Sequence, residues 1–138
     1  MEAVRVRWLG DYRTKTEILR APTDEGGNED DGEGNADLSP SHLLLASVAS
    51  CMCLAVAHIA RKRRVPISRI SVDAVGEVDH SALRYKEVRL VVRSERPQSE
   101  LDTLLEIAKR YCWVSNTLTT GCPVVMTAEP LTMLEADE

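Results

Sequence analysis

The N-terminal part of the chain alternates apolar and polar residues. Positions 4–8 read Val-Arg-Val-Arg-Trp, and a period of two is typical of a strand that buries one face. Gly10 and Asp11 follow and indicate a turn. The stretch Thr14–Leu19 can then return as a second strand.

The same alternation returns twice in the middle of the chain. Apolar residues occupy every second position, or nearly so, over 70–78 and again over 88–92, which predicts an antiparallel hairpin that turns around 79–85. A last strand is predicted for Val124–Leu131. The prolines at 123 and 130 would place that strand at a sheet edge, because proline has no N–H to donate.

A long apolar stretch separates these two groups of strands. Ser39 suits the N-cap of a helix and Pro40 its first residue. The twenty residues that follow contain no Gly, Pro or charge, so the helix is predicted to continue to about Arg63. Because it is apolar nearly all round, it should be buried on most sides. A chain of this size covers such a helix most simply with a second copy, so we expect an obligate homodimer.

A second helix is predicted from Ser99 to about Tyr111, because leucine and alanine recur there at helical spacing. The resulting order is strands, long helix, hairpin, helix and strand. That order favours an α+β fold with helices on one face of an antiparallel sheet. The 138 residues suit a single domain over 1–138.

Charge is distributed unevenly. The net charge is −5, yet residues 23–37 alone carry seven acids, four glycines and no base. This acidic segment is expected to be a mobile, solvated loop. An acidic protein is a poor candidate for nucleic-acid binding, even with the basic run Arg61–Arg64 at the end of the long helix. No uninterrupted stretch of 18 apolar residues or secretory signal is found, so neither a membrane span nor export is expected, and we expect the protein in the cytoplasm.

Four cysteines are the main candidates for chemistry. Cys51 and Cys53 lie on the long helix but point about 200° apart. Cys112 follows the second helix, and Cys122 precedes the last predicted strand. The metal-ligand spacings CxxC and HxxxH are absent, so no metal site is expected, and no phosphate-binding glycine loop suggests a cofactor. In a cytosolic protein these thiols are free or redox-active.

Two segments resemble one known family. Residues 38–51, LSPSHLLLASVASC, resemble the NPEELLLAALASC helix of the OsmC/Ohr hydroperoxide reductases, with the same spacing of eleven residues between Pro40 and Cys51. Residues 111–118, YCWVSNTL, resemble the CPVSNTL motif of that family. Both motifs occur in the family's order, and the resemblance extends from Ser39 to Leu131.

The resemblance implies an intertwined homodimer in which a strongly curved antiparallel sheet wraps around central helices, with two active sites at the dimer interface. Cys51 would be the peroxidatic residue and Cys112 the resolving residue. Family members also carry an N-terminal arginine that stabilises the peroxidatic thiolate, for which Arg13 and Arg20 are the candidates. The implied substrate is an organic hydroperoxide, and the implied reductant is a lipoyl or thioredoxin-type dithiol.

The chain departs from the family motifs at two positions. The family glutamate that pairs with the arginine is Ser41 here, and the proline after the resolving cysteine is Trp113. The sequence therefore leaves two hypotheses. The first is a thiol-dependent peroxidase, and the second is a related protein without turnover that binds a small apolar ligand at the dimer interface.

Overall fold

The computed structural model describes residues 1–19 and 38–131. Arg20 and the acidic segment 23–37 therefore lie outside the described residues. The elements, in chain order, are β1 (Glu2–Trp8), β2 (Thr14–Leu19), α1 (Pro40–Lys62), β3 (Ile70–Asp79), β4 (Arg84–Ser94), α2 (Gln98–Ala108), a 3₁₀ turn η2 (Lys109–Tyr111) and α3 (Trp113–Thr120).

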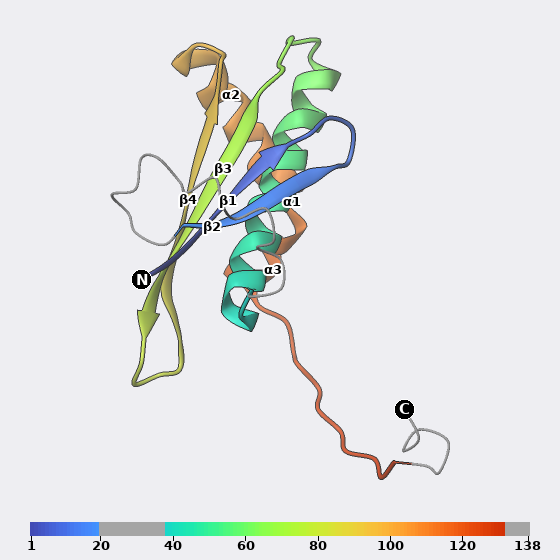
Figure 1. Cartoon of the computed structure of the whole chain (residues 1–138). Coiled ribbons are helices and arrows are strands. Elements are labelled where there is room, and N and C mark those ends of the chain that lie inside the picture. Colours follow the sequence, from blue (N-terminus) through green and yellow to red (C-terminus); the bar gives the residue numbers. More distant parts are fainter. Residues whose placement is uncertain (20–37, 132–138) are drawn as a thin grey trace.

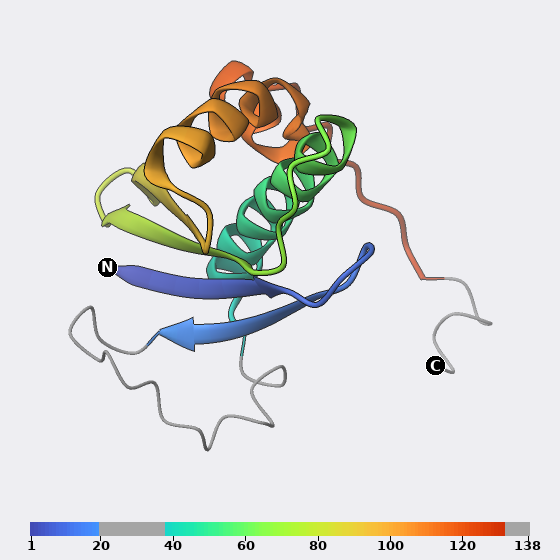
Figure 2. The same cartoon turned by 90° about the horizontal axis from the view of Figure 1, so that it is seen from above.

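The four strands form one antiparallel sheet in the order β2-β1-β3-β4. Helix α1 lies across one face of this sheet, and α2 and α3 lie on the far side of α1 (Figures 1 and 2). The α+β class, the first two strands and the central hairpin are thus confirmed, with helices on a single face of the sheet.

Helix α1 starts and ends where its sequence indicates. The Ser39 side chain caps it by accepting a hydrogen bond from the backbone N–H of His42 at 3.2 Å, and Pro40 is its first residue. Arg61 and Lys62 occupy the last turn, where their charges favour the negative end of the helix dipole. The helix is long and apolar enough to cross a membrane, with a mean hydropathy of 2.2. However, 56% of that window is buried within the domain, which is the pattern of a core helix.

The core is aliphatic and lies between α1 and the sheet. The inward residues of β1 and β3, including Val4, Val6 and Val72, meet Leu45 and Val56 of α1, and all five are fully buried. Burying one such side chain contributes roughly 1.5–3 kcal/mol. The sequence contains no Phe, so these small residues let the helix lie close against the strands.

The outer face of the sheet carries a buried charge. Asp73 of β3 accepts hydrogen bonds from Arg5 Nε at 2.7 Å and Arg5 Nη2 at 2.9 Å, and from Arg93 Nη1 at 2.8 Å. Burial alone would raise the pKa of Asp73, but the hydrogen bonds and charges of the two arginines lower it below its usual value. The carboxylate therefore ties the three strands β1, β3 and β4 together on this face.

Replacing Asp73 with asparagine should lower the free energy of unfolding by about 1.5–3 kcal/mol, the usual range for hydrogen bonds to a charged group. Because folding lowers the pKa of Asp73, its stabilising effect is complete above the unfolded value of about 3.9 and fades as the pH falls through the folded value. Urea titrations of the wild type and Asp73→Asn should thus differ at pH 7 and converge in more acidic solution.

A matched control is Glu87→Gln. Glu87 also lies in the sheet, but it is exposed, and among the described residues it pairs only with Arg89. Its replacement should therefore leave the urea midpoint unchanged. Equal losses in the two variants, or a difference for Asp73→Asn that persists unchanged into acid, would show that the carboxylate does not stabilise the sheet.

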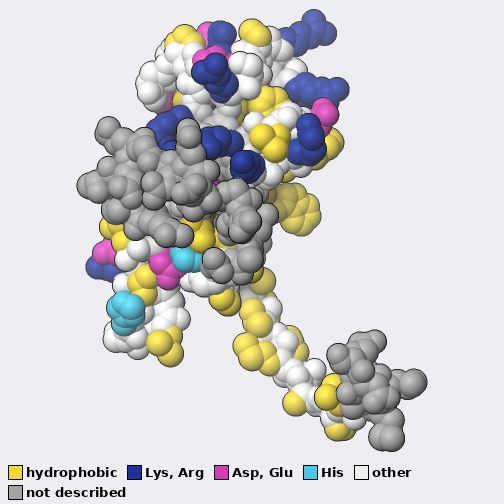
Figure 3. Space-filling view, in the orientation of Figure 1, with side chains coloured by type: hydrophobic (Ala, Val, Ile, Leu, Met, Phe, Trp, Pro, Cys, Tyr) yellow, Lys and Arg dark blue, Asp and Glu magenta, His cyan; other side chains and the backbone are white. Residues whose placement is uncertain are grey.

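The C-terminal part differs from its prediction. Trp113–Thr120 forms a helix, and Gly121, at a φ of 79°, turns the chain away from the domain. The predicted strand Val124–Leu131 is wrong, because these residues form no strand and pair with none of the strands in the described ranges 1–19 and 38–131. Three consecutive apolar residues, Val124 to Met126, give the segment no period of two, and its prolines cannot donate to a ladder. Figure 3 shows its hydrophobic side chains exposed along the projecting chain.

Candidate thiol site

The two cysteines of the family motifs lie where the helices meet. Cys51 sits in the middle of α1, half-buried, and packs against the core. Cys112 lies between η2 and α3 and is fully buried. Helix α1 packs against both η2 and α3, so the fold brings together two residues that are 61 positions apart in the sequence.

The two thiols are free, and Cys51 lies near enough to affect the pKa of Cys112. Burial raises the pKa of Cys112, the neighbouring Cys51 thiol raises it further, and hydrogen bonding from Ser115 acts in the opposite direction. The Ser115 hydroxyl also donates to the Cys112 carbonyl at 3.2 Å, which fixes the first turn of α3 beside the thiol. Because the buried Cys112 thiol lies near the half-buried Cys51 thiol, a product formed at Cys51 can react with Cys112.

The other two cysteines lie elsewhere. Cys53 is fully buried and faces the sheet, where its thiol approaches the Ile70 carbonyl at 4.0 Å. Burial raises the pKa of Cys53 to about 12, so it remains protonated at neutral pH. Cys122 is exposed after α3. The opposite orientation of Cys51 and Cys53, expected from their spacing, is confirmed.

Among the described residues, Arg13 makes no hydrogen bond or ion pair with the thiol site. Arg13 closes the turn between β1 and β2 through its backbone, with hydrogen bonds to Leu9 at 2.9 Å and Gly10 at 3.1 Å, and its side chain is exposed. Among the described residues, its side chain has no hydrogen bond or ion pair. Arg20, the other candidate, lies outside the described residues.

A cluster that sequence reasoning missed lies at the start of α1. One carboxylate oxygen of Glu2, on β1, accepts hydrogen bonds from the Ser41 hydroxyl at 2.5 Å and from the Tyr85 hydroxyl at 2.8 Å. His42 Nε2 lies 3.7 Å from the same oxygen. The hydrogen bond from Ser41 lowers the pKa of Glu2 against the opposing effect of burial. The hydrogen bond from Tyr85 and the charge of His42 lower it further. Glu2 is therefore ionised at neutral pH.

A glycine makes room for this Glu2 corner, the group formed by Glu2, Ser41, His42 and Tyr85. A Cβ atom at Gly76 would lie 2.3 Å from the Tyr85 ring, so only glycine lets the ring lie across β3 and extend its hydroxyl to Glu2. No motif marks Glu2, and the only sequence signal for the corner is the serine at position 41, where the related family has an acid.

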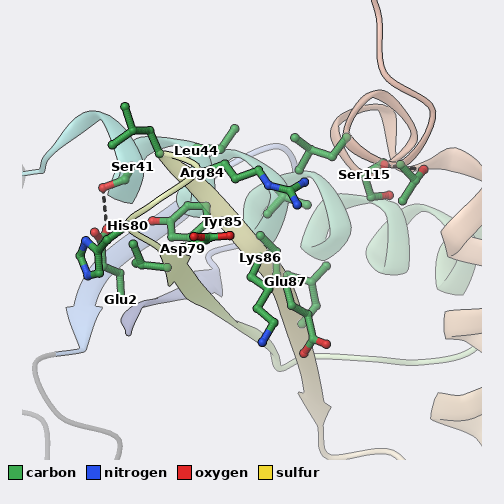
Figure 4. A pocket seen from close by; sticks show the side chains of 17 residues that line it. Glu2, Ser41, Leu44, Asp79, His80, Arg84, Tyr85, Lys86, Glu87 and Ser115 are labelled. Carbon is green, nitrogen blue, oxygen red and sulfur yellow. Dashed lines mark hydrogen bonds between the residues drawn. The ribbon is translucent and has the colours of Figure 1, made fainter.

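An open groove of about 920 Å³ runs from the Glu2 corner toward the thiols (Figure 4). Its apolar lining comes from α1, the β3–β4 hairpin and α3 and comprises Leu44, Val48, Val78, Leu83, Val88, Leu90 and Leu118. Glu2 and Ser41 lie at one end and Ser115 at the other. The thiols themselves do not line it, but Val48 is one turn before Cys51 and Ser115 contacts Cys112.

Comparisons with known proteins agree with this fold. A profile of the OsmC-like protein family matches residues 31–127. An OsmC-like hydroperoxide resistance protein from Jannaschia sp. CCS1 is 17% identical with a TM-score of 0.51, and the match covers 89% of each chain. A protein named for osmotic stress induction and detoxification, from Psychrobacter arcticus 273-4, is 22% identical with a TM-score of 0.52 over 81% of this chain and 84% of that one.

The organic hydroperoxide resistance protein OhrB of Bacillus subtilis is 20% identical over 85% of this chain and 90% of that chain, with a TM-score of 0.48. A comparison with curated protein sequences finds no significant match. The family profile covers well over half of the chain, so this protein belongs to the OsmC-like family, whose members include proteins named for hydroperoxide resistance.

Proposed function

We propose that the protein is a cytoplasmic, homodimeric thiol peroxidase that reduces organic hydroperoxides, with Cys51 as the attacking thiol and Cys112 as the resolving thiol. The observation that carries the proposal is the placement of two free thiols, the half-buried Cys51 of α1 and the buried Cys112, where α1 packs against η2 and α3. Two neighbouring free thiols, one of them partly exposed, are what a two-cysteine cycle requires.

The catalytic cycle needs one external reductant, which returns the two electrons that the peroxide takes up. The Cys51 thiolate attacks a peroxide oxygen, the O–O bond breaks, and the leaving alkoxide takes a proton to become an alcohol. Cys51 is left as a sulfenic acid, which condenses with the Cys112 thiol, releasing water and forming a disulfide. A dithiol of the lipoyl or thioredoxin type then reduces that disulfide by exchange and is itself oxidised.

The apolar groove supports an organic substrate. One end of it is lined by Ser115, which hydrogen-bonds to Cys112, and the leucine and valine side chains in its lining suit the alkyl part of an alkyl or acyl hydroperoxide. The same groove supports the second candidate function, a binding protein without turnover, and the serine at position 41 in place of the family glutamate favours that reading.

The two functions are distinguished by the fate of the thiols. One equivalent of cumene hydroperoxide should convert the reduced protein to a form with an intrachain Cys51–Cys112 disulfide, identified by peptide mapping under non-reducing conditions. Cys122→Ser is the matched control, because it removes the exposed thiol and should give the same disulfide. Unchanged thiols after treatment, or a disulfide at Cys53 or Cys122, would contradict the peroxidase and favour the binding protein.

A further inference from the structure

The outer face of the sheet carries a row of basic residues near the end where β3 begins. The strand register pairs Arg7 of β1 with Lys15 of β2 on one side and with Ser71 of β3 on the other. Ser71 in turn pairs with Arg93 of β4. Paired residues share a face of the sheet, so three cations and a serine form one row across the four strands. Figure 3 shows Lys and Arg side chains gathered on this side of the molecule.

The row is not explained by the stability of the sheet. Lys15 and Arg7 are direct cross-strand neighbours, and like charges in that position are destabilising. Adjacent cations that the fold does not need are what an anion-binding surface requires.

A hollow of about 380 Å³ lies at this row. Arg7, Ser71 and Arg93 line it, together with Arg69, which directly precedes β3. The side chains of Arg7 and Arg93 are 52% and 55% exposed, so the hollow is open to solvent. Pockets for small molecules usually measure roughly 300–1,000 Å³. This basic hollow therefore has the size for a small ligand.

The acids near the basic hollow are bonded to other groups. Glu95 also lines it, but its two carboxylate oxygens accept the backbone N–H groups of Ser68 at 2.7 Å and Arg69 at 2.8 Å. Asp73 pairs with Arg93, but it is shared with a second arginine from β1. Within residues 1–19 and 38–131, the Arg69 side chain forms no ion pair or hydrogen bond. Its guanidinium is thus available to a ligand.

Three arginines favour a ligand with more than two acceptor oxygens. A guanidinium can donate paired N–H groups to a carboxylate or to a phosphate. A carboxylate offers two oxygens and one charge, whereas a phosphate group offers at least three oxygens in a tetrahedron and close to two charges at neutral pH. A phosphate group can therefore accept from three arginines on different segments, and the Ser71 hydroxyl can donate to it as well.

We propose that the basic hollow is a phosphate-binding site, in which Arg7, Arg69 and Arg93 bind the phosphate group of a small solute, either inorganic phosphate or a phosphate monoester. The row lies on the face of the sheet away from α1 (Figure 2), so this site is separate from the thiol pair. Its failure would leave the proposed peroxidase standing, and the failure of the peroxidase would leave this site standing.

The first test is an NMR titration of the ¹⁵N-labelled protein at pH 7.5 and low ionic strength. Inorganic phosphate or ribose 5-phosphate should shift the backbone amide signals of Arg69, Ser71 and Glu95 in a saturable way, with a dissociation constant of about 1 mM or lower. Acetate, the carboxylate probe, should bind at least about tenfold more weakly. Tighter binding of ribose 5-phosphate would assign the site to a monoester, and tighter binding of inorganic phosphate would assign it to the free ion.

The second test removes one guanidinium. Arg69→Gln should weaken phosphate binding about tenfold or more, because a charge-assisted hydrogen bond is lost. It should leave the urea midpoint unchanged, because only the backbone of Arg69 is bonded within the fold. Arg89→Gln is the matched control. It removes the same charge from an exposed position of β4 that pairs with Glu87 and does not line the hollow, so phosphate binding should stay within about twofold of the wild type.

Four results would overturn the inference. They are the absence of saturable shifts with either phosphate probe, binding of acetate as tight as that of phosphate, equal weakening in Arg69→Gln and Arg89→Gln, and binding of an RNA oligonucleotide without binding of the small phosphates. Equal weakening would mean that the general charge of the surface attracts anions. Binding of RNA alone would mean that the row binds a polymer backbone and that the hollow is no site for a small solute.

Discussion

Replacing Cys51 with serine is expected to reduce peroxide consumption to the rate of a reaction without protein. The sulfur of a thiolate is the nucleophile that breaks the O–O bond, and a serine hydroxyl is not ionised near neutral pH. The measurement is consumption of cumene hydroperoxide in the presence of dihydrolipoamide or dithiothreitol, with the reduced protein in catalytic amount.

Cys53→Ser is the matched control on the same helix. Cys53 lies two residues from Cys51 but faces the sheet, fully buried, with its pKa raised to about 12 by that burial. Its replacement should leave the rate of peroxide consumption close to that of the wild type. Activity that survives in Cys51→Ser and disappears in Cys53→Ser would reverse the assignment.

Replacing Cys112 with serine should stop turnover after a single round. The first step needs only Cys51, so one equivalent of peroxide should be consumed at the wild-type rate. Without the buried partner thiol, the sulfenic acid on Cys51 has no neighbour with which to condense. It should therefore accumulate, with a mass increase of one oxygen atom and labelling by dimedone, which reacts with sulfenic acids.

The Cys112→Ser variant also tests whether another cysteine can take the place of Cys112 as the resolving thiol. Cys122 is exposed at the end of α3, while Cys53 faces away from the site, so neither should form a disulfide with Cys51 in Cys112→Ser. Sustained turnover in this variant, with a mapped disulfide to Cys122, would mean that the exposed thiol resolves the intermediate and that Cys112 is structural.

The strands and the long helix could be predicted because each depends on a local pattern. Alternation indicated β1 and the β3–β4 hairpin, and Ser39 followed by Pro40 indicated where α1 begins. The proximity of Cys51 and Cys112 was reached through the family resemblance rather than through spacing. The local sequence around each cysteine contains no signal for this proximity, because the two residues meet only when η2 and α3 fold back onto α1.

Two features could not be predicted, for physical reasons. The helix Trp113–Thr120 contains threonine and asparagine, which have low helical propensity, and its stability depends on packing against α1. The Glu2 corner requires β1, the start of α1 and β4 to converge, with Gly76 leaving room for Tyr85. A single residue at the end of a strand gives no sign of such a convergence.

The reactivity of the buried Cys53 thiol can be used to follow global unfolding. It packs between α1 and β3, where a thiol reagent can reach it only when the helix separates from the sheet. Its labelling rate at increasing urea concentrations therefore measures the free energy of opening the core. In a variant without the other three cysteines, that single thiol would report how Asp73→Asn and Glu87→Gln change the stability of the reduced fold, with no added fluorophore.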